Sequence, residues 1–166
     1  MLKRLIIFLD HANVFHNLDR LKARIDYVRF REILRKDNYL VGAFVYMGIP
    51  QQLLPKKFAF IKYLESQGFV IQTKNIRESP NGKKLQKGID IFIYRDIVEL
   101  ANEDSFDKAI LVSGDSDFVD VIIKLKMLEK EFEIWGFHNS ISHRIIREAG
   151  KENVHLIDEI LSEIKY

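Results

Sequence analysis

The sequence predicts an α/β domain: a three-layer αβα sandwich around a mostly parallel sheet of five or six strands. Two alternating sequence patterns support this prediction. Short apolar runs alternate along the chain with segments in which apolar residues recur every three or four positions. Parallel neighbouring strands need crossover connections, and this alternation supplies helices for them. The length of 166 residues suits one domain, spanning residues 1–166.

The first half of the chain contains three of the expected strands and three of the expected helices. In chain order they are a strand over 5–9, helices over 13–22 and 27–36, a strand over 39–47, a helix over 55–67 and a strand over 69–73. The first strand is continuously apolar, as expected of a strand buried on both faces. Asp26 is a suitable N-cap for the second helix, and the third begins at Pro55 and ends before Gly68, as helix boundaries favour.

The alternation continues after one polar interruption. Residues 74–88 contain Ser79-Pro80-Asn81-Gly82 and are predicted to form a loop. Ile89, Ile93 and Ile97 lie at helical spacing, which predicts an amphipathic helix over 89–101. The remaining elements expected are a strand over 109–112, a helix over 117–130, a strand over 132–137, a helix over 141–149, a short strand over 154–157 and a terminal helix.

Composition excludes several kinds of site. The chain has no cysteine, which rules out disulfides, cysteine-bound metals and thiol nucleophiles. The apolar run 5–9 is shorter than the roughly 7–15 residues of a signal peptide core. The longest uncharged stretch, 38–55, contains two prolines and does not suit a membrane span. We therefore expect a cytoplasmic protein without membrane contact.

Four aspartates lie where such a sheet places its functional residues, beyond the carboxyl ends of the strands. Asp10 ends the first strand, Asp115 and Asp117 follow the strand over 109–112, and Asp90 opens a helix. Taken singly, each is explained by a turn, a helix cap or the helix dipole. In a parallel sheet, however, the carboxylates after the two strands converge on one edge.

Gathered carboxylates need protons or a cation. Two unit charges about 4 Å apart repel by about 4 kcal/mol at an effective dielectric constant of about 20. Ligands that offer only oxygen select Mg²⁺ or Mn²⁺ over zinc or copper. One or two such ions in an acidic cluster can polarise a phosphoryl oxygen and lower the pKa of an attacking water. The sequence therefore points to phosphoester chemistry.

Three motifs, in this order, resemble the NYN domains of the LabA-like group, which are relatives of PIN-domain nucleases. They are Asp10-x-x-Asn13, Lys87-Gly88-Ile89-Asp90 and Val112-Ser113-Gly114-Asp115-Ser116-Asp117-Phe118. The resemblance covers nearly the whole chain, and it implies a PIN-like fold. It also implies that Asp10, Asp90, Asp115 and Asp117 form the metal-binding acidic cluster.

The resemblance assigns further roles. It implies that Asn13 orients the first ligand or contacts substrate, and Asp96 fits a second acidic position on the helix of Asp90. One departure lies late in the chain, where Gly150 replaces the aspartate of the family's pattern. Ser142, Ile145 and Ala149 fit that pattern, so the departure weakens the match of the C-terminal part more than the chemistry.

Other polar residues near the motifs are candidates for substrate contact. They are Lys83, Lys84, Lys87, His11, Ser113 and Ser116. For the lysines the alternative is an ordinary solvated loop, and for the serines a helix cap. A histidine can carry a proton near neutral pH, but metal-activated water needs no such base.

Our first hypothesis is a Mg²⁺- or Mn²⁺-dependent endoribonuclease acting on single-stranded RNA. The sequence leaves open whether the protein forms a homodimer. The second is a non-catalytic RNA- or protein-binding module of the same fold. The third is a phosphatase of the haloacid dehalogenase type, because Val112-Ser113-Gly114-Asp115 resembles its late metal motif. That class needs an aspartate two residues after its nucleophile, and Ala12 occupies this position.

Taken alone, the formal net charge of +2 argues against a strongly basic nucleic-acid binder. Its distribution argues otherwise. Residues 20–36 carry seven basic and two acidic residues, and residues 74–88 carry five basic and one acidic. Residues 89–123 carry nine acidic and two basic residues, including three of the four candidate ligands. A basic loop thus leads into an acidic centre, an arrangement suited to a metal site that receives phosphates.

Overall fold

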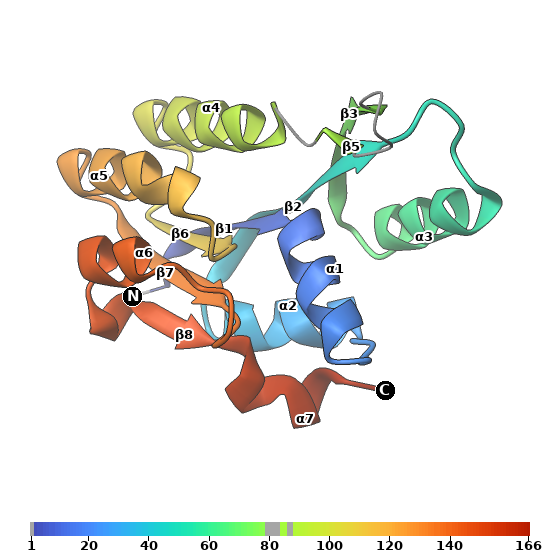
Figure 1. The fold of residues 1–166 in the computed structure, drawn as a ribbon. Coiled ribbons are helices and arrows are strands. Elements are labelled where there is room, and N and C mark those ends of the chain that lie inside the picture. Colours follow the sequence, from blue (N-terminus) through green and yellow to red (C-terminus); the bar gives the residue numbers. More distant parts are fainter. Residues whose placement is uncertain (1, 79–83, 86–87) are drawn as a thin grey trace.

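The computed structural model describes residues 2–78, 84–85 and 88–166 (Figure 1). Its main sheet has six strands, and all neighbours are parallel. This confirms the predicted fold class. In spatial order the strands are β3 (Val70–Asn75), β2 (Tyr39–Ile49), β1 (Arg4–Asp10), β6 (Lys108–Val112), β7 (Glu131–Gly136) and β8 (Val154–Leu156).

Helices cover both faces of this sheet (Figure 1). On one face pack α1 (His11–Arg20), α2 (Tyr27–Arg35), α3 (Pro55–Ser66) and the terminal α7 (Leu161–Ile164). On the other face pack α4 (Ile89–Asn102), α5 (Val119–Met127) and α6 (His143–Ala149). Three short 3₁₀ segments complete the connections: η1 (Ser116–Phe118), η2 (Lys151–Asn153) and η3 (Ile157–Ile160).

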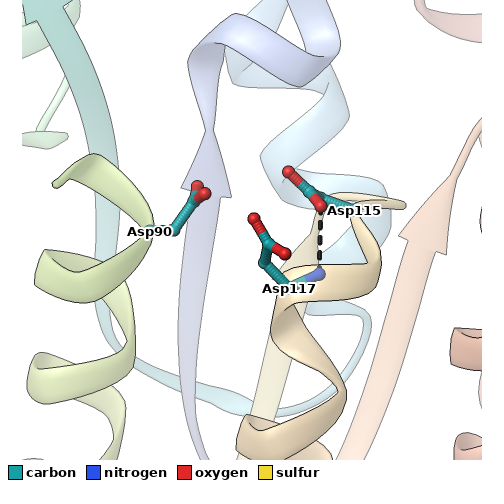
Figure 2. Close-up of side chains that lie close together, drawn as sticks. All are labelled: Asp90, Asp115 and Asp117. Atoms are coloured by element: carbon teal, nitrogen blue, oxygen red, sulfur yellow. Dashed lines mark hydrogen bonds between the residues drawn. The ribbon is translucent and has the colours of Figure 1, made fainter. Parts of the chain in front are cut away.

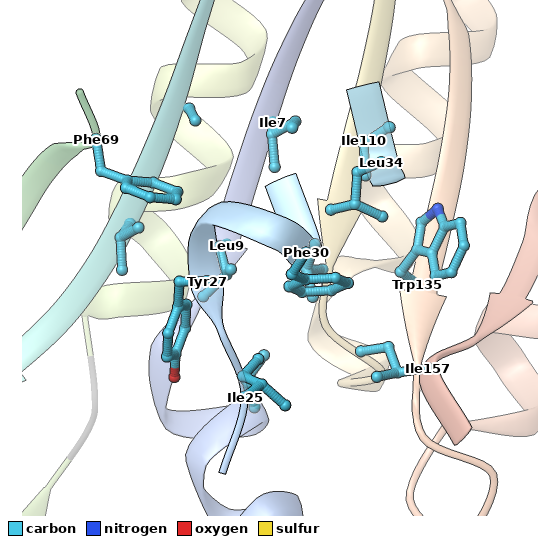
Figure 3. Close-up of a cluster of buried hydrophobic side chains, with 14 of the residues drawn as sticks. Ile7, Leu9, Ile25, Tyr27, Phe30, Leu34, Phe69, Ile110, Trp135 and Ile157 are labelled. Atoms are coloured by element: carbon cyan, nitrogen blue, oxygen red, sulfur yellow. The ribbon is translucent and has the colours of Figure 1, made fainter. Parts of the chain in front are cut away.

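Strand β1 supplies both halves of the core. Its alternate residues Leu5, Ile7 and Leu9 join the apolar cluster on the α1 and α2 face, part of which Figure 3 shows. Ile6 and Phe8 join the cluster under α4 and α5. Successive side chains of a strand point to opposite faces, so a strand covered on both sides must be apolar throughout. This explains the uninterrupted apolar run read from the sequence.

The order of the strands reverses beside β1. The chain passes from β1 through α1 and α2 to β2 on one side, and β6 pairs with β1 on the other. In open α/β sheets a crevice forms beyond the carboxyl ends of the strands at such a reversal. The residues that follow β1 and β6 therefore meet at this point, which is where the candidate ligands lie.

Two elements differ from the prediction. The polar stretch predicted as a loop contains two short strands, β4 (Arg77–Glu78) and β5 (Lys84–Leu85), which pair antiparallel. Two residues on each side are too few to create a periodic apolar signal. The helix expected over 117–130 begins instead as η1, whose N-cap is Asp115, and continues as α5, which ends at Met127.

No helix in the part of the chain that the structure describes is both long enough and apolar enough to cross a membrane.

Candidate metal centre

Three aspartates from two separate parts of the chain meet at the carboxyl edge of the sheet (Figure 2). One oxygen each of Asp90, Asp115 and Asp117 lies within 4.8 Å of the others. Asp90 comes from the first turn of α4, Asp115 follows β6, and Asp117 lies in η1. Asp90 and Asp115 are half-buried, and Asp117 is exposed.

Local backbone chemistry places Asp115 and Asp117. The backbone N–H of Asp117 donates to Oδ1 of Asp115 at 3.0 Å, the dashed line in Figure 2. Asp115 is therefore the N-cap of η1, the role that the sequence also allowed for Ser116 or Asp117. The cap and the cluster are compatible, because a carboxylate can accept at one oxygen and bind a cation at the other.

Asp10 lies beside the cluster without belonging to the group of three. It ends β1 and is buried, with 5% of its surface exposed. The hydroxyl of Ser113 donates to Oδ2 of Asp10 at 3.0 Å, and the backbone N–H of Asn13 approaches Oδ1 at 3.5 Å. The backbone N–H of Asp115 donates to the Ser113 hydroxyl at 3.3 Å. Ser113 thus links the ends of β1 and β6.

Asn13 also ties these two strand ends together. Its Oδ1 accepts from the backbone N–H of Gly114 at 3.3 Å, and its carbonyl accepts from the side chain of Asn17 at 2.7 Å. The amide therefore orients the loop after β6, while the backbone N–H reaches the first candidate ligand. Substrate contact by Asn13 stays a prediction.

Negative charge is crowded at this edge. Burial raises the pKa of Asp90 to about 7, and the charges of Asp115 and Asp10 act in the same direction. The pKa of Asp10 is also raised, mainly by burial, although the hydrogen bond from Ser113 opposes this. Among the side chains that the structure describes, no lysine or arginine forms an ion pair with any of these aspartates. Within the described part of the chain, these carboxylates therefore have no salt-bridge partner.

A small divalent cation fits this donor set. Mg²⁺ prefers oxygen ligands at about 2.0–2.1 Å in octahedral geometry, so opposite ligand oxygens lie roughly 4 Å apart. Neighbouring ligand oxygens lie closer, at roughly 3 Å, so the three oxygens, which lie within 4.8 Å of one another, have to draw together to share one ion. The exposure of Asp117 leaves this edge open to solvent, as Mg²⁺ requires for the waters it retains.

The remaining candidates are placed differently. His11 is buried and stacks on Phe15, away from the group of three. Burial, followed by the charge of Lys57, lowers the pKa of His11 to about 4, so its imidazole is neutral at pH 7. Ser113 is fully buried, whereas Ser116 opens η1 and is half-buried, and substrate contact by either serine stays a prediction.

The three lysine candidates lie in the segment that precedes α4 in the sequence. The backbone of Lys84 lies in β5. Lys83 and Lys87 lie outside the described residues. Contact between these lysines and RNA stays a prediction.

Sequence reasoning left Asp96 open and missed its partner. Oδ2 of Asp96 accepts from the hydroxyl of Tyr46 at 2.8 Å, and Asp96 lies outside the group of three. Tyr46 occupies an ordinary apolar position of β2, so no sequence signal distinguishes it from a core residue. Only the packing of α4 on β2 brings the pair together.

Gly114 is expected to be intolerant of a side chain. A Cβ at this position would lie 2.8 Å from the backbone Cα of Ile141. We predict that Gly114→Ala lowers the free energy of unfolding by about 1–3 kcal/mol, the usual cost of overpacking. Urea denaturation measures this loss. Gly42→Ala is the control, because its Cβ would meet only the ring of Phe44 at 3.5 Å. Equal stability of Gly114→Ala and the wild type would contradict the prediction.

A solved structure shares this architecture. The chain is similar to the crystal structure of VPA0982, a protein of unknown function from Vibrio parahaemolyticus RIMD 2210633, with a TM-score of 0.80. The two share 24% identity over 99% of this chain and 96% of that chain, which shows a common fold. The C-terminal domain of PF1911 hydrogenase from Pyrococcus furiosus has a TM-score of 0.48 at 12% identity, covering 79% of this chain and 89% of that chain.

A comparison with curated proteins finds no match. The family model of the NYN domain matches residues 4–156, a range that contains all six strands of the main sheet and all four candidate ligands. The chain therefore belongs to the NYN domain family.

Proposed function

We propose that this protein is a Mg²⁺- or Mn²⁺-dependent endoribonuclease of the LabA-like group. The observation that carries the proposal is the cluster of Asp90, Asp115 and Asp117, whose oxygens lie within 4.8 Å of one another beside the buried Asp10. Family membership adds a nuclease-like fold. Carboxylates gathered without a salt-bridge partner among the described residues suit a divalent cation.

Each residue has a distinct part in the proposed site. Asp90, Asp115 and Asp117 would hold the cation between α4 and η1, and Asp10 would face it from the end of β1. Ser113 would keep Asp10 in place by donating to Oδ2. The cation, when bound, polarises a phosphoryl oxygen and lowers the pKa of a water. Attack of water on phosphorus, with loss of the bond to the 3′ oxygen and transfer of a proton from the water to that oxygen, would leave a 5′-phosphate and a 3′-hydroxyl.

Single-stranded RNA is the proposed substrate. Sequence-specific proteins read RNA mainly in single strands and loops, where bases can be splayed out. The exposed Asp117 places the cluster at an open edge that such a strand can approach. Lys83, Lys84 and Lys87, in the segment that leads into α4, are the proposed contacts for its phosphates.

The direct test is incubation of the wild-type protein with end-labelled single-stranded RNA and Mn²⁺. We expect cleavage products that carry a 5′-phosphate, and no cleavage when EDTA removes the metal. Cleavage that persists in EDTA, or that leaves a cyclic phosphate, would overturn the proposal. Calorimetric titration with Mn²⁺ completes the test, because the absence of binding would favour a non-catalytic binding module of the same fold.

A further inference from the structure

A buried tyrosine connects helix α4, which carries Asp90, to the strand next to β1. The hydroxyl of Tyr46 donates to Oδ2 of Asp96 at 2.8 Å. Tyr46 is 1% exposed, and burial together with Asp96 raises the pKa of its phenol above the usual range. The phenol therefore keeps its proton at physiological pH and acts as the donor, while the carboxylate of Asp96 accepts.

Tyr46 also lies beside the first candidate ligand. In the register of β1 with β2, Tyr46 is the partner of Asp10. The ring of Tyr46 packs in the apolar cluster on the α4 side of the sheet, together with Phe8 of β1. The side chain of Tyr46 thus reaches from the β2 position paired with Asp10 to helix α4, which carries Asp90.

Helix α4 holds this ring at two points. Asp96 accepts the hydrogen bond, and the ring of Phe92 meets the ring of Tyr46 edge-on, with centroids 5.6 Å apart. Phe92 and Asp96 are four residues apart, so they share one face of the helix. Phe92 is only two residues beyond Asp90, which brings the contact close to the first turn of α4.

The first turn of α4 has few other polar anchors. Its N-cap is Gly88, with a φ of +104°, and no side chain caps the helix. Ile89, Ile93 and Ile97 bury an apolar stripe, but apolar contacts are not directional and tolerate sliding. Among the described hydrogen bonds, the bond from Tyr46 to Asp96 is the one that joins a side chain of α4 to a side chain of the sheet.

We infer that Tyr46 and Asp96 form a positioning pair, which holds α4 where the carboxylate of Asp90 meets Asp115 and Asp117. This inference rests on the proposed metal centre and deepens it. Asp96 acts through the helix and is no metal ligand in this arrangement. It lies six residues, about 9 Å of helix, beyond Asp90, and the structure leaves it out of the group of three.

The test compares three variants by calorimetric titration with Mn²⁺, at a temperature where thermal melts show each variant to be folded. Tyr46→Phe and Asp96→Ala remove the hydrogen bond, and we expect each to raise the Kd for Mn²⁺ by about three- to tenfold. Asp96→Asn removes the charge but retains an oxygen that accepts from the phenol. We expect its Kd to stay within about twofold of the wild type.

Each alternative predicts a different pattern. If Asp96 were a ligand, Asp96→Asn would lose affinity for Mn²⁺ as strongly as Asp96→Ala, which would overturn the inference. If the pair only stabilised the fold, Tyr46→Phe and Asp96→Ala would melt earlier but keep the Kd of the wild type, which would also overturn it. Tyr94→Phe is the matched control, since no described hydrogen bond involves that hydroxyl and Tyr94 lies on the same helix.

A kinetic measurement separates this inference from the proposed function. If the protein cleaves RNA, Tyr46→Phe should raise the Mn²⁺ concentration for half-maximal cleavage and leave the rate at saturating Mn²⁺ within about twofold of the wild type. If the wild type binds Mn²⁺ without cleaving RNA, the proposed function fails, while the pattern of Kd values still supports the positioning pair. A wild type that binds no Mn²⁺ overturns both.

Discussion

Asp115→Asn is expected to lower the rate of Mn²⁺-dependent RNA cleavage at least a hundredfold. Asp115 lies between Ser113, which links it to Asp10, and Asp117, whose backbone it caps. Asparagine retains an oxygen for this cap, so η1 should persist, but it removes a negative charge from the ligand set. Metal-assisted catalysis supplies several kcal/mol, and a loss of about 3 kcal/mol corresponds to roughly a hundredfold in rate.

The control for this variant is Asp120→Asn. Asp120 is exposed in the first turn of α5 and lies outside the cluster. The Asp120→Asn variant, purified in the same way, should cleave labelled RNA at the wild-type rate. Equal cleavage by the wild type and Asp115→Asn would identify the activity as a contaminant and sink the nuclease hypothesis. Circular dichroism of each variant verifies that the fold is retained.

The second large effect is expected in thermal stability. At pH 8 and a Mn²⁺ concentration one hundred times the Kd, binding stabilises the folded state by about 2.7 kcal/mol. For a chain of this size, each kcal/mol shifts Tm by about 2–4 °C, so Tm should rise by about 5–11 °C. Asp90→Asn should lose most of this rise, because it removes a ligand from the first turn of α4.

Without metal, the same substitution should have the opposite effect. The pKa of Asp90 is about 7 in the fold, above its ordinary value of 3.8, so the folded state favours the protonated carboxyl. Stability then falls as pH rises from about 4 to about 7, and the loss is complete above pH 7. Because solvent screens the half-exposed Asp90, we expect Asp90→Asn to stabilise the metal-free protein by about 1 kcal/mol at pH 8.

Thermal melts with and without EDTA measure both effects. The advantage of Asp90→Asn should shrink as the pH is lowered from 7 toward 4. Glu99→Gln, an exposed change on the same helix, should behave like the wild type in every condition. A metal-free Asp90→Asn that is less stable than the wild type at pH 8 would show that burial and the neighbouring aspartates do not disfavour the charged form of Asp90.

The core and the order of elements were predictable because their signals are local. The apolar run of β1 reflects burial on both faces, and the spacing of Ile89, Ile93 and Ile97 reflects the apolar stripe of α4. The short pair β4 and β5 was not predictable, because two paired residues on each side leave no periodic pattern. The break between η1 and α5 was also missed, since it depends on the cap that Asp115 provides.

The candidate site, like the fold, was predictable from the sequence only in part. The three motifs predicted which aspartates share an edge, since parallel strands end together, and the structure brings three of the four within 4.8 Å. The fourth, Asp10, lies outside this group: it is buried, and its Oδ2 accepts a hydrogen bond from the hydroxyl of Ser113. His11 illustrates the limit of proximity in sequence: it follows Asp10 directly, yet its ring stacks on Phe15 and lies tilted against Phe60.

By itself, the sequence determined the fold class and the six strands of the main sheet, because hydrophobic periodicity and helix boundaries depend on neighbouring positions. Only the tertiary structure decided the spacing of the carboxylates, the raised pKa of Asp90 and the pairing of Tyr46 with Asp96. These depend on how α4 packs against β2, η1 and the end of β1, which brings together residues far apart in the sequence. The packing of core side chains sets the distances between these elements, and a local sequence pattern does not contain that information.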